Sequence, residues 1–177
     1  MEIKTVQDAI ELLKLINAPL RLLMHHKLVV EAAQKLVKEI QSRFNLKFDA
    51  NLVLIGAALH DCGKVVYPQE MTGSGNQHES TGEQMLLSKG ISPEIARFCR
   101  THAQWAETDI TLEDLLVALA DKLWKGCRDE ALESKVINYI TQESNLPTWK
   151  VFVEADLVFE TIALEGPNRL IRSANIV

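Results

Sequence analysis

Residues 51–65 read NLVLIGAALHDCGKV, an apolar run that ends in a His-Asp pair. The run is apolar on nearly all sides, which favours a helix in the middle of the molecule. Asp49 or Asn51 can cap the start of this helix. His60 and Asp61 then stand where a central helix ends. Because a single His-Asp pair also occurs by chance, its meaning depends on whether partners lie elsewhere in the chain.

Helical periodicity continues along the rest of the chain, with apolar residues recurring every three or four positions. Candidate N-terminal caps are Thr5, Ser92 and Thr111. The stretch VFVEADLVF is ambiguous between strand and helix, and its position after Pro147 favours helix. Residues 65–77 are rich in Gly and Pro and are expected to form a loop. We expect an all-α fold of about seven to nine helices in one domain, residues 1–177.

The composition fits a soluble globular protein, with 47% hydrophobic and 24% charged residues among 177. The net charge of −5 argues against a general nucleic-acid binder, which normally has a basic face. A phosphorylated substrate would therefore need positive charge from a few local residues or from metal ions.

Three cysteines without Cys-x-x-Cys spacing indicate reduced, intracellular thiols rather than a disulfide framework. The amphipathic N-terminus carries acidic residues and does not resemble a signal peptide. No apolar run approaches the length of a membrane span. We therefore expect a cytoplasmic protein that is not bound to a membrane.

Histidine and aspartate residues stand on apolar faces or at the ends of five separate helical segments. They are His26, His60, Asp61, His78, His102 and Asp121. Taken singly, each has an ordinary explanation: His26 can be a satisfied or exposed histidine, and His78 and His102 can be helix-terminal residues. His25 lies about 100° around the helix from His26 and is expected at the surface.

Asp121 is the most informative of these residues, because it interrupts the apolar stretch LLVALADKLW. Burying a lone carboxylate is costly unless it is paired or bound to metal. Lys122 or Arg128 could pair with it, or it could lie at the edge of the helix. The alternative is that it belongs to a metal site.

The six residues together are typical of a site for divalent transition metals, because imidazole and carboxylate suit Mn²⁺, Fe, Zn²⁺, Ni²⁺ or Co²⁺. His60 and Asp61 are adjacent and point to different sides, so Asp61 could reach two metals. Two metals about 4 Å apart can stabilise the attacking and leaving oxygens of a phosphoryl transfer and activate a water molecule.

The order H…HD…H…H…D resembles that of the HD-domain metal-dependent phosphohydrolase superfamily. The motifs are MHHKLVVEAA, ALHDCGK, QHESTGEQML, CRTHAQW and ALADKLW. In that family an apolar residue follows the first histidine by four positions and a small residue follows it by seven. Val30 and Ala33 fit this register for His26. The resemblance spans about residues 20–130 and implies an HD-type helical bundle, with C-terminal helices at 130–177.

The resemblance also implies the ligands of two metal ions. One ion would be held by His26, His60, Asp61 and Asp121, and the second by Asp61, His78 and His102. Asp61 and Lys64 would act in catalysis, with Lys64 binding a phosphate oxygen. The other interpretation of Lys64 is a solvated loop lysine.

The expected activity is hydrolysis of a phosphoester or phosphoanhydride of a small molecule, with a nucleotide as the expected substrate. The chain is loosely similar to symmetrical diadenosine-tetraphosphate hydrolases in length and in an Ala120-Asp121 pair followed by Arg128. The alternatives are an HD-type di-iron oxygenase and a non-catalytic metal-binding regulatory domain. Residues 130–177 could pack on the core, line a substrate mouth or form a homodimer face.

Overall fold

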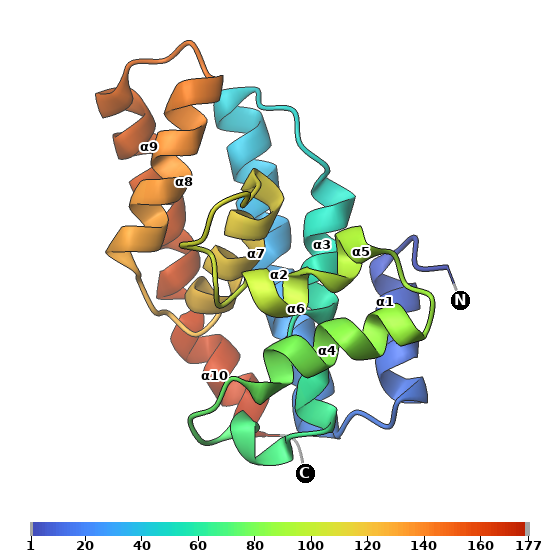
Figure 1. The fold of residues 1–177 in the computed structure, drawn as a ribbon. Coiled ribbons are helices and arrows are strands. Elements are labelled where there is room, and N and C mark those ends of the chain that lie inside the picture. Colours follow the sequence, from blue (N-terminus) through green and yellow to red (C-terminus); the bar gives the residue numbers. More distant parts are fainter. Residues whose placement is uncertain (1, 176–177) are drawn as a thin grey trace.

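The computed structural model describes residues 2–175, and every regular element in that range is helical (Figure 1). The α-helices are α1 (Val6–Leu15), α2 (Leu20–Phe44), α3 (Ala50–Leu59), α4 (Gln77–Ser88), α5 (Pro93–Ala96), α6 (Phe98–Thr101), α7 (Leu112–Leu123), α8 (Glu130–Glu143), α9 (Thr148–Leu164) and α10 (Gly166–Ala174). Two 3-10 helices, η1 (Cys62–Val65) and η2 (Pro68–Met71), connect α3 to α4. The all-α prediction is confirmed, and within 2–175 eight helices have nine or more residues.

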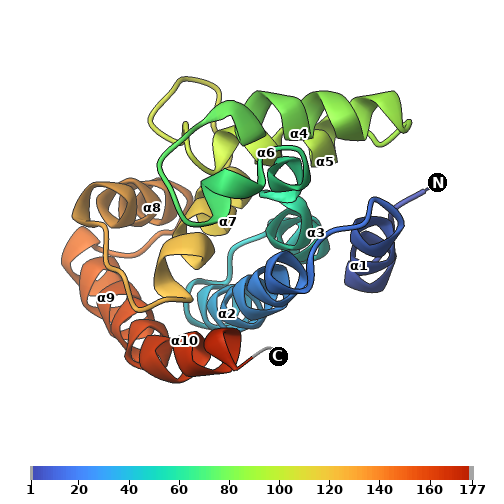
Figure 2. The ribbon, with the colours of Figure 1, turned by 90° about the horizontal axis from the view of Figure 1, so that it is seen from below.

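Helices α2, α3 and α7 pack against one another and form the centre of the bundle. The apolar run identified in the sequence becomes α3, and seven of its ten residues are buried. The short helices α5 and α6 and the longer α4 cover one side of α3, while α8, α9 and α10 lie on the other side of the bundle (Figures 1 and 2). This arrangement brings the C-terminal end of α3 into the middle of the molecule.

Local signals in the sequence fix several helix starts. Thr5 and Thr111 each form a capping box with the acidic residue three positions on, and these are Asp8 and Asp114. Asp49, not Asn51, caps α3 by accepting a hydrogen bond from the backbone N–H of Leu52 at 2.9 Å. The ambiguous VFVEADLVF stretch lies inside α9. The sequence alone therefore identified the starts of α1, α3 and α7.

Two features differ from the expectations. In the segment 92–102, the candidate cap Ser92 followed by Pro93 and Glu94 predicts one helix, but the structure divides this segment at Arg97 into α5 and α6. The chain also adds α10, which begins with Gly166 and Pro167, a pair that resembles a helix terminator. Gly166 lies against the turn at Gly126, where an added Cβ would come within 2.2 Å of the Gly126 nitrogen. The glycine therefore allows the close approach of two turns, and Pro167 begins a new helix.

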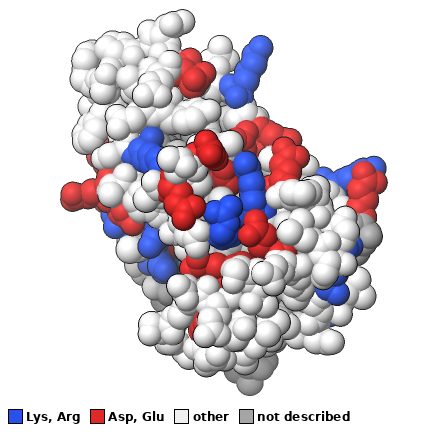
Figure 3. Space-filling model, in the orientation of Figure 1, with Lys and Arg blue, Asp and Glu red and all other residues white. Residues whose placement is uncertain are grey.

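The surface on the face shown in Figure 3 carries acidic and basic side chains interspersed with one another. The described residues on this face form no extended basic area. Across residues 2–175, no helix is both long enough and apolar enough to cross a bilayer.

Candidate metal centre

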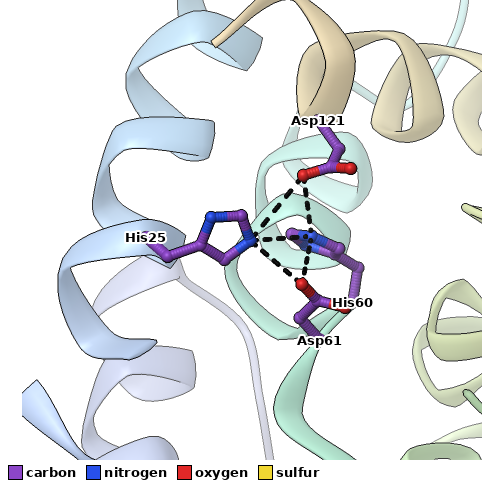
Figure 4. A group of neighbouring side chains, drawn as sticks. All are labelled: His25, His60, Asp61 and Asp121. Carbon is purple, nitrogen blue, oxygen red and sulfur yellow. Dashed lines mark hydrogen bonds and ion pairs between the residues drawn. The ribbon is translucent and has the colours of Figure 1, made fainter. Parts of the chain in front are cut away.

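Four side chains from three helices meet where α3 ends (Figure 4). His25 comes from α2, His60 and Asp61 follow α3, and Asp121 comes from α7. The His25 Nε2 atom lies 3.3 Å from His60 Nε2, 3.1 Å from Asp61 Oδ2 and 3.7 Å from Asp121 Oδ1. The His60 Nε2 atom lies 3.4 Å from Asp121 Oδ1. We call these four residues the open group, because the cleft described below reaches three of them, His25, Asp61 and Asp121.

The second carboxylate oxygen of Asp61 faces a different set of side chains. Its Oδ1 atom lies 3.1 Å from His78 Nε2 and 3.4 Å from His102 Nε2. His78 belongs to the first turn of α4, and His102 caps the end of α6. Asp61, His78 and His102 are all buried, and we call them the enclosed group. Asp61 is therefore shared by both groups, with one oxygen in each.

Three of the histidines are oriented by bonds on the far side of the ring. The Nδ1 atom of His60 lies 3.0 Å from the Ala57 carbonyl, and that of His102 lies 3.0 Å from the Phe98 carbonyl. The Nδ1 atom of His78 lies 2.6 Å from the carboxylate of Glu70. An Nδ1–H donated to these acceptors leaves Nε2 as a free lone pair that points into the groups. This is the arrangement found around metal-ligating histidines.

Glu70 is a functional residue that the sequence reading missed. It lies in η2, inside the segment expected to be a loop, and its side chain is buried. Its carboxylate also accepts hydrogen bonds from the backbone N–H groups of Gln77 and His78, at 3.3 and 3.1 Å. Glu70 therefore fixes both the start of α4 and the ring of His78. A glutamate in a Gly- and Pro-rich stretch gives no periodic signal that could have identified it.

Gly63, two residues after Asp61, brings the two halves of the centre together. A Cβ at this position would lie 2.0 Å from the carbonyl oxygen of His78, so only glycine permits η1 and α4 to approach this closely. The glycine of the HDCGK stretch thus sets the distance between the His-Asp pair and His78.

The structure places His25, rather than the expected His26, among the four residues of the open group. His25, expected at the surface, has a side chain only 17% exposed and belongs to the open group. His26 is completely buried and faces α3, with its Nδ1 atom 3.4 Å from the Ala57 carbonyl. The two residues differ by about 100° around α2, so only one of them can face α7 and the cleft. His26 lies outside both groups.

Asp121 faces histidines rather than a lysine or an arginine. Its carboxylate approaches His60 and His25, while Arg128 pairs with Glu133, Asp156 and Glu160, and Lys122 lies 3.9 Å from Asp129. Neither basic residue considered as its partner reaches it. The pairing explanation for this carboxylate is therefore wrong, and the carboxylate joins the open group.

The charged groups of the centre lower one another's pKa values or raise them. Burial alone would raise the pKa of Asp61, but the nearby imidazoles of His60, His25 and His78 hold that pKa well below its usual range. Burial likewise opposes the ionisation of Asp121, yet its interactions with His60 lower its pKa. Burial lowers the pKa of His102 to about 4, which keeps this imidazole neutral near pH 7. Ionised carboxylates and a neutral His102 imidazole are protonation states that bind metal ions.

Unpaired atoms provide a further test of whether a metal ion fits. Asp61 Oδ1 and His78 Nε2 are buried, and neither makes a hydrogen bond of acceptable geometry to a described residue. Buried polar atoms of this kind are costly unless something satisfies them. A divalent cation between Asp61, His78 and His102 would satisfy both atoms. The donor set of the open group, two imidazoles and two carboxylates, suits a divalent transition metal equally well.

A cleft of about 960 Å³ opens in front of the open group. His25, Asp61 and Asp121 form its floor, and Lys64 lies beside them. The Lys64 ammonium is 2.5 Å from Asp61 Oδ2 and its side chain is 18% exposed, so it is not a freely solvated loop lysine. A small molecule in the cleft would contact the open group and Lys64 directly.

Comparison with known proteins agrees with this geometry. The pattern that defines the HD domain matches residues 22–124, more than half of the chain, and this range contains every residue of both groups. Searches of curated proteins and of solved structures found no match. The chain therefore belongs to the HD domain family, whose superfamily consists mostly of metal-dependent phosphohydrolases.

Proposed function

We propose that this protein is a metal-dependent phosphohydrolase with a dinuclear centre. One divalent metal ion is held by the open group (His25, His60, Asp61 and Asp121) and the other by the enclosed group (Asp61, His78 and His102). The observation that carries the proposal is the division of the Asp61 carboxylate, with Oδ2 in the first group and Oδ1 in the second. A single carboxylate that faces two ligand sets is suited to bridging two metal ions.

Two bound divalent ions supply an activated water molecule and the positive charge that phosphoryl transfer requires. The protein contributes fixed ligands: the Nδ1 bonds of His60, His78 and His102 hold their Nε2 atoms toward the centre. Asp121 and Asp61 contribute carboxylates that stay ionised because the neighbouring histidines lower their pKa values. The histidines are thus oriented, and the carboxylates ionised, before a substrate arrives.

Lys64 supplies local positive charge in a chain of net charge −5. Its ammonium lies at the cleft wall, against the same Asp61 oxygen that faces the open group. With a metal ion held by the open group, Lys64 would be free to turn toward the cleft and bind a phosphate oxygen as a point charge. Lys64 is therefore proposed as a substrate-binding and charge-stabilising residue.

The proposed substrate is a phosphorylated small molecule, and a nucleotide in particular. The cleft volume of about 960 Å³ is at the upper end of the range for small-molecule sites. A nucleotide would fill such a cleft better than a single phosphate group would. The bond cleaved would be a phosphoester or a phosphoanhydride.

The experiment is a phosphate-release screen with protein reconstituted with Mn²⁺ or Fe²⁺. The panel contains p-nitrophenyl phosphate, bis-p-nitrophenyl phosphate, nucleoside mono-, di- and triphosphates, and dinucleoside polyphosphates. We expect release that requires metal, stops with EDTA and is absent in Asp61→Asn. A fully metallated protein that hydrolyses no member of the panel would overturn the proposal, and oxygen uptake by a di-iron form would point to an oxygenase instead.

A further inference from the structure

The cleft has a wall that lies outside the matched HD domain. Its floor and charged side come from residues within 22–124, but Leu170, Ser173 and Ala174 of α10 close it on another side. Leu20, at the start of α2, and Trp124, at the end of α7, also line it. The C-terminal segment therefore contributes directly to the space in front of the open group.

This wall exposes apolar surface. Leu20 is 56% exposed and Leu170 is 43% exposed, although both side chains are large and hydrophobic. The Trp124 ring lies edge-on to the His25 ring, with the centroids 5.0 Å apart. The apolar wall thus begins directly beside a ligand of the open group. Exposed apolar side chains that line a cleft, next to a few polar groups, are typical of ligand-binding sites.

The position of α10 is fixed by a buried arginine. Arg169 is 1% exposed, and its guanidinium donates to Glu31 at 3.1 Å, to the Ile162 carbonyl at 2.9 Å and to Glu165 at 2.7 Å. These partners lie on α2, on α9 and just after α9, and α10 runs alongside α2 (Figure 2). Burying a guanidinium is costly unless it is fully paired, so these bonds define one orientation of the helix.

That orientation decides which residues face the cleft. With Arg169 held toward α2 and α9, the helical rotation of about 100° per residue turns Leu170 and Ala174 together onto an adjacent face. Both of these residues line the cleft. Ile171, the next residue along, is 62% exposed and does not line it. The anchor therefore presents one particular apolar face of α10 to the site.

The lining of the cleft combines charged and apolar side chains. The cationic side chains of Lys64, Arg21 and Lys125 line it, and the open group forms its floor. The α10 side offers two leucines, Trp124 and small residues, with no charged side chain from α10 itself. A molecule that matches this lining carries both a phosphate and a flat apolar group.

We propose that α10, Leu20 and Trp124 form a binding subsite for an aromatic or heterocyclic group attached to the phosphate. The substrate class is then aryl or heterocyclic phosphates, such as those of nucleosides, in preference to alkyl or inorganic phosphates. This inference rests on the proposed function only in placing the phosphate at the metal centre. Leu170 is its specificity-determining residue, and Arg169 is the positioning residue that orients it.

Binding of two phosphonates that cannot be hydrolysed tests the subsite without relying on activity. Phenylphosphonate and methylphosphonate are titrated by calorimetry into the metal-reconstituted full chain, at a pH where both are dianions. Burial of the phenyl ring should make phenylphosphonate bind about tenfold more tightly to the wild type. In Leu170→Gln this ratio should fall to about twofold, with the affinity for methylphosphonate unchanged. Ile171→Gln, the matched control on the same helix, should keep the wild-type ratio.

Each outcome has a distinct meaning. If methylphosphonate binds and Leu170→Gln keeps the wild-type ratio, the aromatic subsite is wrong while the proposed function stands. If the wild type binds both phosphonates equally, the subsite is also wrong. If metallated wild type binds neither, the phosphate does not go to the metal centre, and both the proposed function and the inference built on it are overturned.

Discussion

The open and enclosed groups share Asp61 but differ in their access to solvent. In the open group His25 and Asp121 are each 17% exposed and line the cleft. In the enclosed group His78 is 7% exposed and His102 is 8% exposed, and neither lines the cleft. Under the proposed function, this difference corresponds to a division of roles: the substrate would meet the open group, while the enclosed group would hold a metal ion through buried, well-oriented ligands.

The largest loss of activity should follow from replacing Asp61, the residue that the two groups share. Asp61→Asn takes a negative charge from both, so metal binding should weaken on both sides of the residue. We expect metal-dependent phosphate release to fall by about a thousandfold or more, a loss of about 4 kcal/mol of transition-state stabilisation. Steady-state kinetics with Mn²⁺ measure this. A variant that kept a tenth of wild-type activity would contradict the shared role of Asp61.

The adjacent histidines of α2 provide a matched pair that tests the open group alone. His25→Leu removes a ligand and should lower activity by about a hundredfold, while the enclosed group still binds metal. His26→Leu removes a buried ring outside both groups, so it should lower the free energy of unfolding but leave the metal content unchanged. Elemental analysis and urea unfolding of both variants check this. The reverse pattern would restore His26 as the ligand.

Metal binding by the enclosed group should depend on the buried carboxylate of Glu70, which orients His78. Glu70→Ala removes the acceptor that orients His78, and we expect a loss of about 10- to 100-fold in metal affinity on that side only. Glu70→Gln keeps a carbonyl acceptor for the His78 ring and should retain more of the affinity. Metal titration of both variants against wild type measures the difference. Equal behaviour of the Ala variant and wild type would show that Glu70 does not position His78.

The packing of α10, which forms one wall of the cleft, should depend on the buried Arg169. Arg169→Met leaves Glu31 and Glu165 without this partner and removes three hydrogen bonds. Both glutamates are partly exposed and can be hydrated, so we expect a loss of about 2 kcal/mol in the free energy of unfolding, less than for a fully buried pair. Urea unfolding followed by circular dichroism measures the loss. A change of less than about 0.5 kcal/mol, the size usual for surface substitutions, would contradict the anchoring role.

The smallest expected effect is the pH dependence of stability that comes from Glu31, which pairs with Arg169. The hydrogen bond from Arg172 lowers the pKa of Glu31, burial opposes this, and the hydrogen bond from Arg169 lowers the pKa further. A carboxyl with a lowered pKa in the fold stabilises the protein above its ordinary value of 4.5, and this contribution is lost as the pH falls. Glu31→Gln should therefore lose less stability than wild type between about pH 5.5 and about pH 3. Parallel curves for the two proteins would show that the ion pair contributes nothing.

Much of the fold was predictable from the sequence, because helix periodicity and capping are local properties. The apolar run before His60 identified the central helix, and Thr5 and Thr111 identified two helix starts. Asp121 could be singled out because a carboxylate in an apolar stripe is costly. These predictions required no knowledge of how the helices pack.

The remaining features depend on packing. The register that pointed to His26 through Val30 and Ala33 fits His25 equally well through Val29 and Ala32, and all four of those apolar residues are buried. Only the rotation of α2 against α3 and α7 decides between the two histidines. Glu70 and Arg169 act through contacts that are distant in sequence or lie in irregular segments, and no periodic pattern marks them.

The most direct test of the account is the number of metal ions bound per chain. Wild-type protein reconstituted under anaerobic conditions with Fe²⁺ or Mn²⁺ and freed of excess metal should retain about two ions by elemental analysis. The Asp61→Asn variant, treated identically, should retain less than about one. Wild-type protein with only trace metal, or an Asp61→Asn variant that still holds two ions, would contradict a dinuclear centre bridged by Asp61.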